Sequence, residues 1–445
     1  MFSQDITGKW FGLLNVSGAQ LRLELNIQNQ DSIFVAQLIS IDQNNAIMNI
    51  DKIEFLDLNL EFSIEKSKIS YKGTLKDTII NGIFFQQTKF PLNFQRSPIK
   101  KKTINHFQEP KKPYPYYEEE VFIKNKKDKI ILAGTLTLPQ KEGKFPAVIL
   151  ISGSGPQNRN EEIIGHKPFL VISDFLTRNG IAVLRFDDRG IGKSKGNFSK
   201  ATTYDFSNDV EAIFKYLQKR KEIIKNKIGL IGHSEGAMIA SMVASRNKNI
   251  DFVIFLAGPG IPIDSLLIMQ TEAIAKASGL IDDEIEITSK LNFKIYQLVK
   301  SENNLDSIKL KTKDLMIKFQ NDNPDLLESL DEKSIDAQIQ TITNTWFRYF
   351  IKFIPELYIK NIKCPLLALN GNKDLQVIAK ENLSAIEKIL KKNGNNNVII
   401  KELDNQNHLF QECETGSPSE YSEIEQTFSP IALNEILKFI NSNIK

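Results

Sequence analysis

The chain has 445 residues, of which 41% are hydrophobic and 25% charged, a composition that excludes an intrinsically disordered protein and predicts more than one domain. Its 57 Lys and Arg residues nearly balance its 54 Asp and Glu residues, and the net charge of +3 argues against a nucleic-acid-binding protein. No apolar run approaches the roughly 20 residues of a membrane-spanning helix, so we expect no transmembrane segment.

The cysteines and the first residues leave the compartment open. Cys364 and Cys413 are too few for a disulfide framework or a structural zinc site, and the sequence does not decide whether they pair. The chain begins MFSQDITGKW, without a basic and apolar signal segment. This start fits a periplasmic or secreted protein whose signal peptide was removed, and it equally fits a cytoplasmic protein.

Residues 1–97 have the pattern of short strands. Apolar and polar residues alternate with the period of a half-buried strand, and Gly, Asn and Asp fall between the segments, as turns require. Strands are expected at residues 20–27, 58–64, 68–75 and 79–85. We predict an N-terminal antiparallel β-barrel-like domain, in the form of a small barrel or a curled sheet.

Residues 98–118 have the composition of a linker. Prolines, lysines and glutamates alternate there without an apolar period, so this segment is not expected to bury a core. His106 lies within it and is expected to be a solvated linker histidine.

From residue 119 to residue 445, nearly continuous apolar strands alternate with helical segments. Strands are expected at residues 133–139, 147–153, 181–186, 228–232, 252–258, 365–371 and 398–403, and helices at 205–220 and 381–392. This alternation predicts an α/β domain with a mostly parallel central sheet and helices on both faces. Residues 262–350 have a helical period instead and predict a helical insertion, which is either a cap over the site or a peripheral addition.

The segment IGLIGHSEGAMIA, residues 228–240, places Ser234 between a buried strand and a helix. Glycines two residues before and two residues after a serine leave room for the tight turn of a nucleophile elbow. We therefore predict that Ser234 is a nucleophile, and the alternative is a structural turn serine.

A serine hydroxyl needs a base, and four histidines are available. His408 follows the last predicted strand, whereas His166 precedes a helix and His233 is held beside the serine by the elbow. The base in turn needs a carboxylate to orient it. Asp374 follows a buried strand and gives the order Ser, Asp, His, while Asp404 is a competitor from the loop of His408 itself.

Two backbone amides are expected to bind the oxyanion of a tetrahedral intermediate. One is the N–H of Glu235, and the other comes from the loop SGSGPQNRN, where Ser154 and Gly155 are the candidates. A plain Gly-Pro turn is the alternative for this loop. The stretch RFDDRGIGKSKG, residues 185–196, lacks the ending of a phosphate-binding loop, and its acids and arginine are expected to stabilise the loop after a central strand.

Taken together, these stretches resemble the α/β-hydrolase superfamily, and more narrowly the bacterial carboxylesterases of the EstD type and the related serine aminopeptidase-like hydrolases. The resemblance covers residues 119–445 and rests on LAGTLTLP, FPAVILISGSGPQNRNE, GHKPFL, LRFDDRGIGKS, IGLIGHSEGAM, LALNGNKDLQV and NHLFQ. It implies that Ser234, Asp374 and His408 occupy the triad positions, that the substrates are esters with short acyl chains, and that a β-rich domain precedes the hydrolase domain.

We therefore expect a serine carboxylesterase that acts on a small-molecule ester through an acyl-enzyme, without a metal ion or cofactor. A peptidase or acyl-CoA thioesterase with the same triad is one alternative, in which Asp282, Asp283 or Glu284 would bind an amine. The other alternative is a non-catalytic binding protein on a hydrolase scaffold. The sequence does not predict the physiological ester or the oligomeric state.

Overall fold

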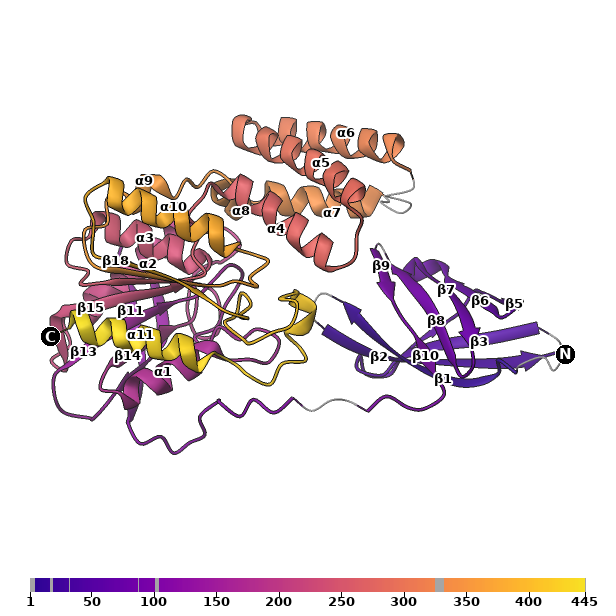
Figure 1. Cartoon of the computed structure of the whole chain (residues 1–445), viewed down its shortest axis with the longest axis horizontal. Helices are drawn as coiled ribbons and strands as arrows, with labels where there is room; N and C mark the ends of the chain where they lie inside the picture. The colour runs from indigo at the N-terminus through magenta and orange to yellow at the C-terminus, as the bar shows by residue number, and fades with distance from the viewer. Residues whose placement is uncertain are drawn as a thin grey trace. The chain divides into compact units, whose positions relative to one another are not determined.

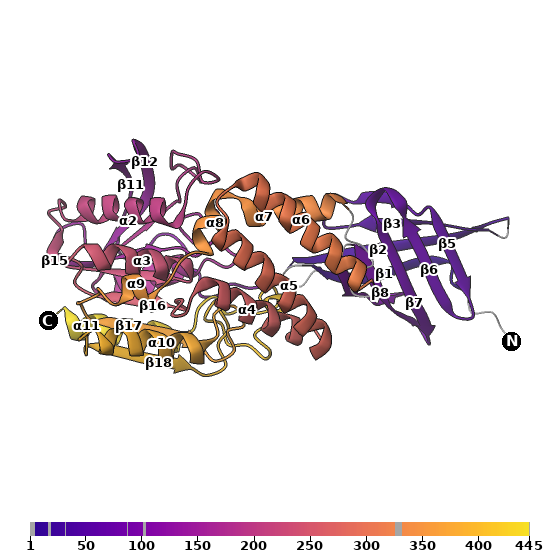
Figure 2. The same cartoon turned by 90° about the horizontal axis from the view of Figure 1, so that it is seen from above.

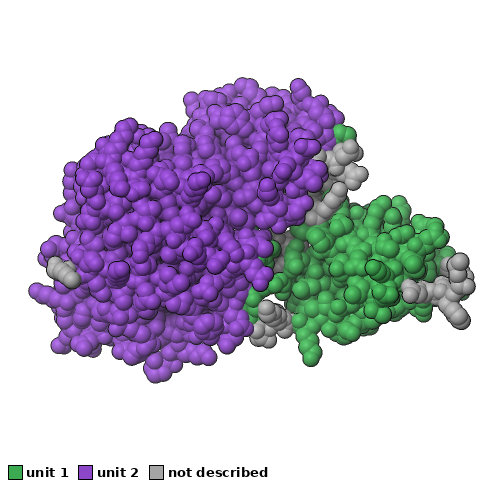
Figure 3. All heavy atoms as spheres, viewed as in Figure 1, with its two compact units in different colours: residues 1–104, 324–334, 418–423 green, residues 105–323, 335–417, 424–445 purple. Residues whose placement is uncertain are grey.

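The computed structural model describes residues 5–16, 19–31, 33–86, 88–100, 104–324 and 332–444. The chain divides into two compact units, which Figure 3 shows in different colours. Unit 1 consists of residues 1–104, 324–334 and 418–423. Unit 2 consists of residues 105–323, 335–417 and 424–445.

Unit 1 contains an antiparallel sheet whose strands mostly pair with their neighbours in sequence. The strands are β1 (Gly8–Val16), β2 (Ala19–Gln30), β3 (Ile33–Ser40), β4 (Ala46–Asn49), β5 (Lys52–Leu56), β6 (Asn59–Ile64), β7 (Ile69–Lys76), β8 (Ile79–Gln86), β9 (Thr88–Pro91) and β10 (Phe94–Gln95), with the short 3-10 helices η1 (Glu65–Ser67) and η2 (Pro418–Glu420). Their order is β4-β3-β2-β1-β10-β8-β7-β6-β5, with β9 paired to β8. The antiparallel sheet predicted for this region is confirmed.

The sheet of unit 1 has the form of a half-barrel. Among the described residues the strand pairing ends at β4 on one side and at β5 on the other. The two residues between these strands connect the two ends of the strand order, because the Ile50 N–H donates to the Ala36 carbonyl of β3 and the Asp51 N–H to the Ser63 carbonyl of β6. Alternate residues of the strands point inward and form a core of their own, as the period of two requires.

Unit 2 contains the mixed sheet predicted for an α/β protein. Its strands are β11 (Tyr117–Asn125), β12 (Ile130–Leu138), β13 (Phe145–Ile151), β14 (Ala182–Phe186), β15 (Ile223–His233), β16 (Val253–Leu256), β17 (Leu366–Gly371) and β18 (Val398–Leu403). Their order is β11-β12-β14-β13-β15-β16-β17-β18. Strands β11, β12 and β14 pair antiparallel, and all pairs from β14 and β13 to β18 are parallel. The carboxyl ends of the parallel strands therefore meet at one edge, where α/β proteins place their sites.

Helices cover both faces of this sheet (Figures 1 and 2). They are α1 (Pro168–Arg178), α2 (Thr203–Leu217), α3 (Glu235–Arg246), α9 (Glu356–Ile359), α10 (Ala379–Lys392) and α11 (Pro430–Asn443). Helices α2, α3 and α10 share one core with alternate strand residues such as Ile149, and helices α1 and α11 share the other with residues such as Val148. The central strands β13, β14, β16 and β17 are almost entirely buried, which is why their sequences lack alternation, whereas the edge strand β11 alternates between exposed and buried residues.

Among the described residues, six helices lie between β16 and β17 in sequence, and the first five form a group of their own (Figure 1). They are α4 (Ile263–Ala277), α5 (Asp282–Ser301), α6 (Leu305–Asp322), α7 (Glu332–Thr343) and α8 (Thr345–Phe350). In the described part of the chain no helix combines the length and the apolar character that crossing a membrane requires.

Candidate active site

Ser234 sits at a sharp turn between β15 and α3, at the carboxyl edge of the sheet. Its backbone angles are φ 53° and ψ −118°, a region that L-residues other than glycine rarely adopt. Such a conformation costs about 1–3 kcal/mol and persists only where the surrounding structure enforces it. The turn displays the side chain of Ser234, which remains partly exposed between buried neighbours.

The two glycines of the turn are required by close backbone packing. A Cβ atom on Gly232 would lie 2.1 Å from the carbonyl oxygen of Gly236, and one on Gly236 would lie 2.1 Å from the carbonyl oxygen of Ile151. A side chain at Gly232 would therefore force β15 and α3 apart, and one at Gly236 would force β13 and α3 apart. This explains the Gly-x-Ser-x-Gly spacing in physical terms.

His408 and Asp374 lie in the loops that follow β18 and β17, and the structure brings them together. The Nδ1 atom of His408 is 2.8 Å from Oδ2 of Asp374, and both side chains are buried. The other carboxylate oxygen of Asp374 accepts the backbone N–H groups of Gln376 and Val377 at 2.8 Å. A carboxylate only accepts hydrogen bonds when ionised, so this pairing places the proton on Nδ1 and leaves Nε2 of His408 as an acceptor.

The competing carboxylate, Asp404, points elsewhere. Its Oδ1 accepts a hydrogen bond from Asn372 Nδ2 at 3.0 Å on the exposed side of the loop. We name residues 404–413, which contain Asp404 and His408, the β18 loop. Of the two carboxylates weighed from the sequence, only Asp374 bonds to His408 within the described residues.

Ser234 and His408 are linked through the residue before the serine. His233 Nε2 is 2.9 Å from the carbonyl oxygen of His408, and the two imidazole ring centres are 4.8 Å apart. Within the described part of the chain the Ser234 hydroxyl makes no hydrogen bond, although its backbone N–H donates to Leu256. Hydrogen bonds between nucleophile and base are often long in unliganded enzymes and shorten when substrate binds.

The loop after β13 (residues 152–161, named the β13 loop) packs directly against Ser234. A Cβ atom on Gly153 would lie 3.3 Å from Cβ of Ser234. The Gly153 N–H is already bonded to Glu161, but the N–H groups of Ser154 and Gly155 have no partner among the described residues. The N–H of Glu235, the first residue of α3, also lacks an intrahelical acceptor, as helix N-termini do. The backbone N–H groups of Ser154, Gly155 and Glu235 are the ones that the sequence predicts for binding an oxyanion.

Two acids after β14 hold the β13 loop in place. Asp187 accepts hydrogen bonds from the backbone and side chain of Arg159, and Asp188 accepts from the Gln157 N–H at 2.9 Å and the Ser152 hydroxyl at 3.2 Å. Burial raises the pKa of Asp188 to about 8, so this carboxyl group carries a proton near neutral pH. The loop geometry therefore depends on groups that the sequence places far from it.

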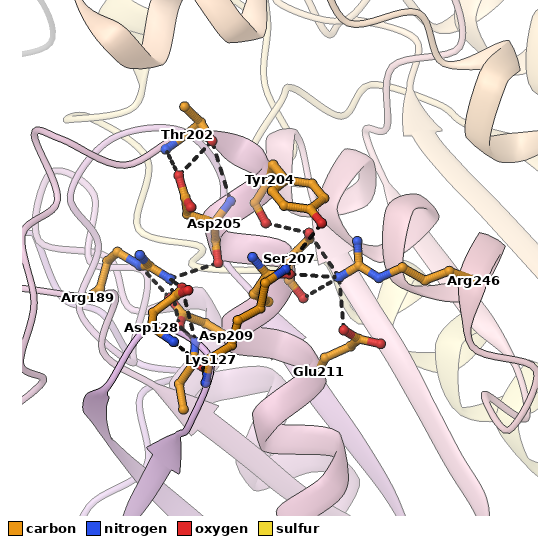
Figure 4. A network of polar contacts seen from close by, with 12 residues as sticks. Lys127, Asp128, Arg189, Thr202, Tyr204, Asp205, Ser207, Asp209, Glu211 and Arg246 are labelled. Atoms are coloured by element: carbon orange, nitrogen blue, oxygen red, sulfur yellow. Dashed lines mark hydrogen bonds and ion pairs between the residues drawn. The ribbon is translucent and has the colours of Figure 1, made fainter.

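Arg189 belongs to a polar network beside the site (Figure 4). Its guanidinium bonds to Asp209 at 2.7 Å and to Asp128 at 2.6 Å. In the same view Arg246 reaches Ser207 and Glu211 across helix α2. The Arg189 guanidinium is therefore engaged in structural ion pairs. This agrees with the expectation that residues 185–196 stabilise a loop and do not bind phosphate.

The side chain of Glu235 is fully buried next to Ser234. Its carboxylate accepts hydrogen bonds from the Thr203 hydroxyl at 2.6 Å and from the indole N–H of Trp346 in α8 at 2.9 Å. Burial raises its pKa to about 7, although both hydrogen bonds favour the ionised form. Helix α8 of the inserted group therefore contacts the residue that follows the nucleophile candidate.

Sequence reasoning missed Glu161, and it was wrong about His106. Glu161 bonds to His233 through Oε1 and Nδ1 at 2.9 Å, a contact that no local spacing rule predicts. His106 is partly buried, with its ring centre 4.3 Å from that of His166, so it is not a solvated linker residue. The neighbouring Gln108 bonds to the backbone of Phe428, which holds this segment on unit 2.

Cys364 and Cys413 form no disulfide in the described structure. No group of three or more His, Cys, Asp or Glu residues in the described ranges has the arrangement of a metal site.

Comparison with known proteins gives three related findings. The family model described as serine aminopeptidase, S33, matches residues 169–412. The chain is 24% identical over 430 residues to esterase EstD of Thermotoga maritima, covering 95% of this chain and 89% of that protein. Among solved structures it is similar to the Pyrococcus furiosus esterase Pf2001, with 18% identity, a TM-score of 0.45 and coverage of 74% of this chain and 94% of that one. It is also similar to Est1E of Butyrivibrio proteoclasticus, with 18% identity, a TM-score of 0.42 and coverage of 73% and 99%.

Proposed function

The chain belongs to the serine aminopeptidase (S33) family of α/β hydrolases, and we propose that it is a serine carboxylesterase that cleaves short-chain acyl esters through Ser234, His408 and Asp374. The relative with the most extensive overlap reported above is an esterase, and its similarity spans 95% of this chain. The observation that carries the proposal is the 2.8 Å bond between His408 Nδ1 and Asp374, because it leaves Nε2 as the basic nitrogen of a residue whose backbone carbonyl bonds to His233, the residue before Ser234.

In the proposed reaction, His408 Nε2 takes the proton of the Ser234 hydroxyl while the oxygen attacks the ester carbonyl. The tetrahedral intermediate places its negative oxygen on the N–H of Glu235 and on the N–H of Ser154 or Gly155. His408 then protonates the leaving alcohol, and an acyl-enzyme remains on Ser234. Water, deprotonated by His408, attacks this acyl group and releases the carboxylic acid. Asp374 stabilises the imidazolium that forms in each half of the reaction.

We also infer that helices α4 to α8 act as a cap. The supporting contact is the bond between Trp346 of α8 and Glu235, the neighbour of Ser234. Such a cap would limit the acyl chain that the site accepts, which agrees with a preference for short chains. Of the three acids considered for an amine site, Asp282 and Asp283 are exposed in the first turn of α5, and Glu284 accepts the Ile281 N–H at 3.4 Å. No contact of these acids among the described residues favours a peptidase.

The test compares Ser234→Ala with Ser245→Ala, a serine of helix α3 whose hydroxyl donates to the Met242 carbonyl. We expect Ser234→Ala to lower kcat on p-nitrophenyl acetate and butyrate by about 10⁶-fold, as loss of a triad nucleophile does, and Ser245→Ala to leave it unchanged. A fluorophosphonate probe should label the wild type and not Ser234→Ala. Equal turnover by the wild type and Ser234→Ala would refute the proposal.

The same proteins distinguish the alternative substrates. Esters of increasing chain length, an aminoacyl anilide and an acyl-CoA are compared by kcat/KM. We expect the highest kcat/KM on the esters with short acyl chains. A higher kcat/KM on the anilide or on the acyl-CoA would assign a peptidase or a thioesterase instead. Failure of every substrate together with failure of the probe would indicate a binding protein.

A further inference from the structure

We propose that Glu161 and His233 form a positioning pair, which holds the β13 loop and the β18 loop against Ser234 through one continuous set of hydrogen bonds. This inference rests on the proposed function and adds two residues that do not touch the reacting atoms. The pair lies under the site, where three segments distant in sequence meet.

Glu161 provides the first half of the connection. Its Oε1 accepts the Gly153 N–H at 2.6 Å and faces His233 Nδ1 at 2.9 Å. The Glu161 side chain is only 1% exposed. One oxygen atom therefore joins the start of the β13 loop to the last residue of β15. The Ser154 and Gly155 amides follow Gly153 directly, so the Glu161 bond fixes the backbone that carries them.

His233 provides the second half. Its Nε2 lies 2.9 Å from the carbonyl oxygen of His408. A carbonyl oxygen only accepts hydrogen bonds, so this nitrogen carries a proton. The bond restrains the backbone of the base itself, while Asp374 restrains its ring. Because Ser234 is the next residue in the chain, His233 sets the distance between the nucleophile and the base.

The protonation of the pair follows from these partners. Since Nε2 of His233 donates to His408, a carboxylate at Nδ1 requires a second N–H on the same ring. Burial opposes a charged ring, but the Glu161 carboxylate prevails and raises the pKa of His233 above its ordinary value. When the ring carries both protons, His233 donates to Glu161 and to the His408 carbonyl at once.

A role in folding stability alone does not explain this arrangement. Burying an ion pair costs desolvation energy that the attraction often fails to recover, and apolar residues of similar size are frequently as stabilising. Glu161 also adopts a left-handed backbone conformation, with φ 51°, which is unfavourable for a glutamate. Strain of this kind concentrates at functional sites, where it fixes the position of reacting groups.

The experiment measures kcat and KM on p-nitrophenyl acetate for Glu161→Gln and His233→Ala, with active sites counted by fluorophosphonate titration. Counting sites removes the effect of misfolded protein. We expect kcat per site to fall about 10²-fold in both variants, because a misplacement of about 1 Å costs that much, and KM to change little. The matched control is Glu162→Gln, whose carboxylate accepts only an exposed Asn158 amide at 3.3 Å. Its kcat per site and its KM should equal those of the wild type.

A second comparison separates positioning from folding. In His233→Gln the side-chain amide can still donate to the His408 carbonyl, so kcat per site should recover at least about tenfold relative to His233→Ala, as a geometric role requires. If Glu161→Gln yields no titratable sites, this comparison decides the question. The proposed positioning role would be refuted if kcat per site in Glu161→Gln and His233→Ala stayed within twofold of the wild-type value. It would also be refuted if kcat per site did not recover in His233→Gln. The Ser234→Ala control keeps the outcomes distinct, because only its activity tests the proposed function.

Discussion

Substitution of Glu235 by glutamine should make the stability of unit 2 less sensitive to pH. The carboxyl group is buried beside Ser234, and burial raises its pKa from 4.5 to about 7. Glutamine has the same shape, can still accept hydrogen bonds from Thr203 and Trp346, and has no charge to desolvate. The backbone N–H proposed for the oxyanion remains in the variant.

The sign and the size of the change in unfolding free energy follow from the linkage between folding and proton binding. Near pH 4.5 the folded protein keeps this proton, and above that pH the unfolded chain loses it first, so wild-type stability falls as pH rises towards 7. At about 1.4 kcal/mol for each pH unit, the loss reaches about 3 kcal/mol above pH 7. The free energy of unfolding of Glu235→Gln, relative to wild type, should therefore increase by about 3 kcal/mol between pH 4.5 and pH 8.

Urea unfolding of both proteins at pH 4.5 and pH 8 measures this change. Any constant cost of replacing the carboxyl by an amide cancels, because only the change with pH is compared. Parallel pH dependence in the wild type and Glu235→Gln would refute the argument that this buried carboxyl keeps its proton to near pH 7.

Two further variants test the geometry of the site. Asp374→Asn should lower kcat on a short p-nitrophenyl ester by about 10⁴-fold, because the amide no longer fixes the proton on His408 Nδ1. Its thermal stability should be unchanged. A loss of kcat below tenfold would contradict the role given to the Asp374 carboxylate. Gly236→Ala should lower the free energy of unfolding by about 3 kcal/mol, because its Cβ would lie 2.1 Å from the Ile151 carbonyl oxygen; an unchanged urea midpoint would show that the turn relaxes freely.

The elements of unit 2 were predictable because their sequences are strongly patterned. The strand expected at 398–403 is β18 (Val398–Leu403), and the helix expected at 381–392 lies within α10 (Ala379–Lys392). The central strands are near-continuous apolar runs, which are typical of strands covered on both faces. The α/β-hydrolase fold predicted from the sequence is confirmed by the family match, and the resemblance to EstD-type esterases is confirmed by the curated relative.

Other features were hidden because their partners are distant in sequence. His106 looked solvated within a proline-rich segment, yet it packs on His166. A segment without an apolar period can still lie on a surface when its side chains bond there, as Gln108 does.

The candidate site shows the same division between local and distant information. The Gly-x-Ser-x-Gly turn is local, so spacing alone located Ser234. Glu161 is 72 residues from His233, and His233 is 175 residues from His408, so no pattern in one segment reveals that they bond. Two buried acids nearby, Glu235 and Asp188, have pKa values raised to about 7 and about 8. Near and below neutral pH their protons remove negative charge from the place where the proposed reaction builds an oxyanion. A carboxylate that stayed ionised there would repel that oxyanion, so the burial that weakens folding at high pH also favours the proposed chemistry.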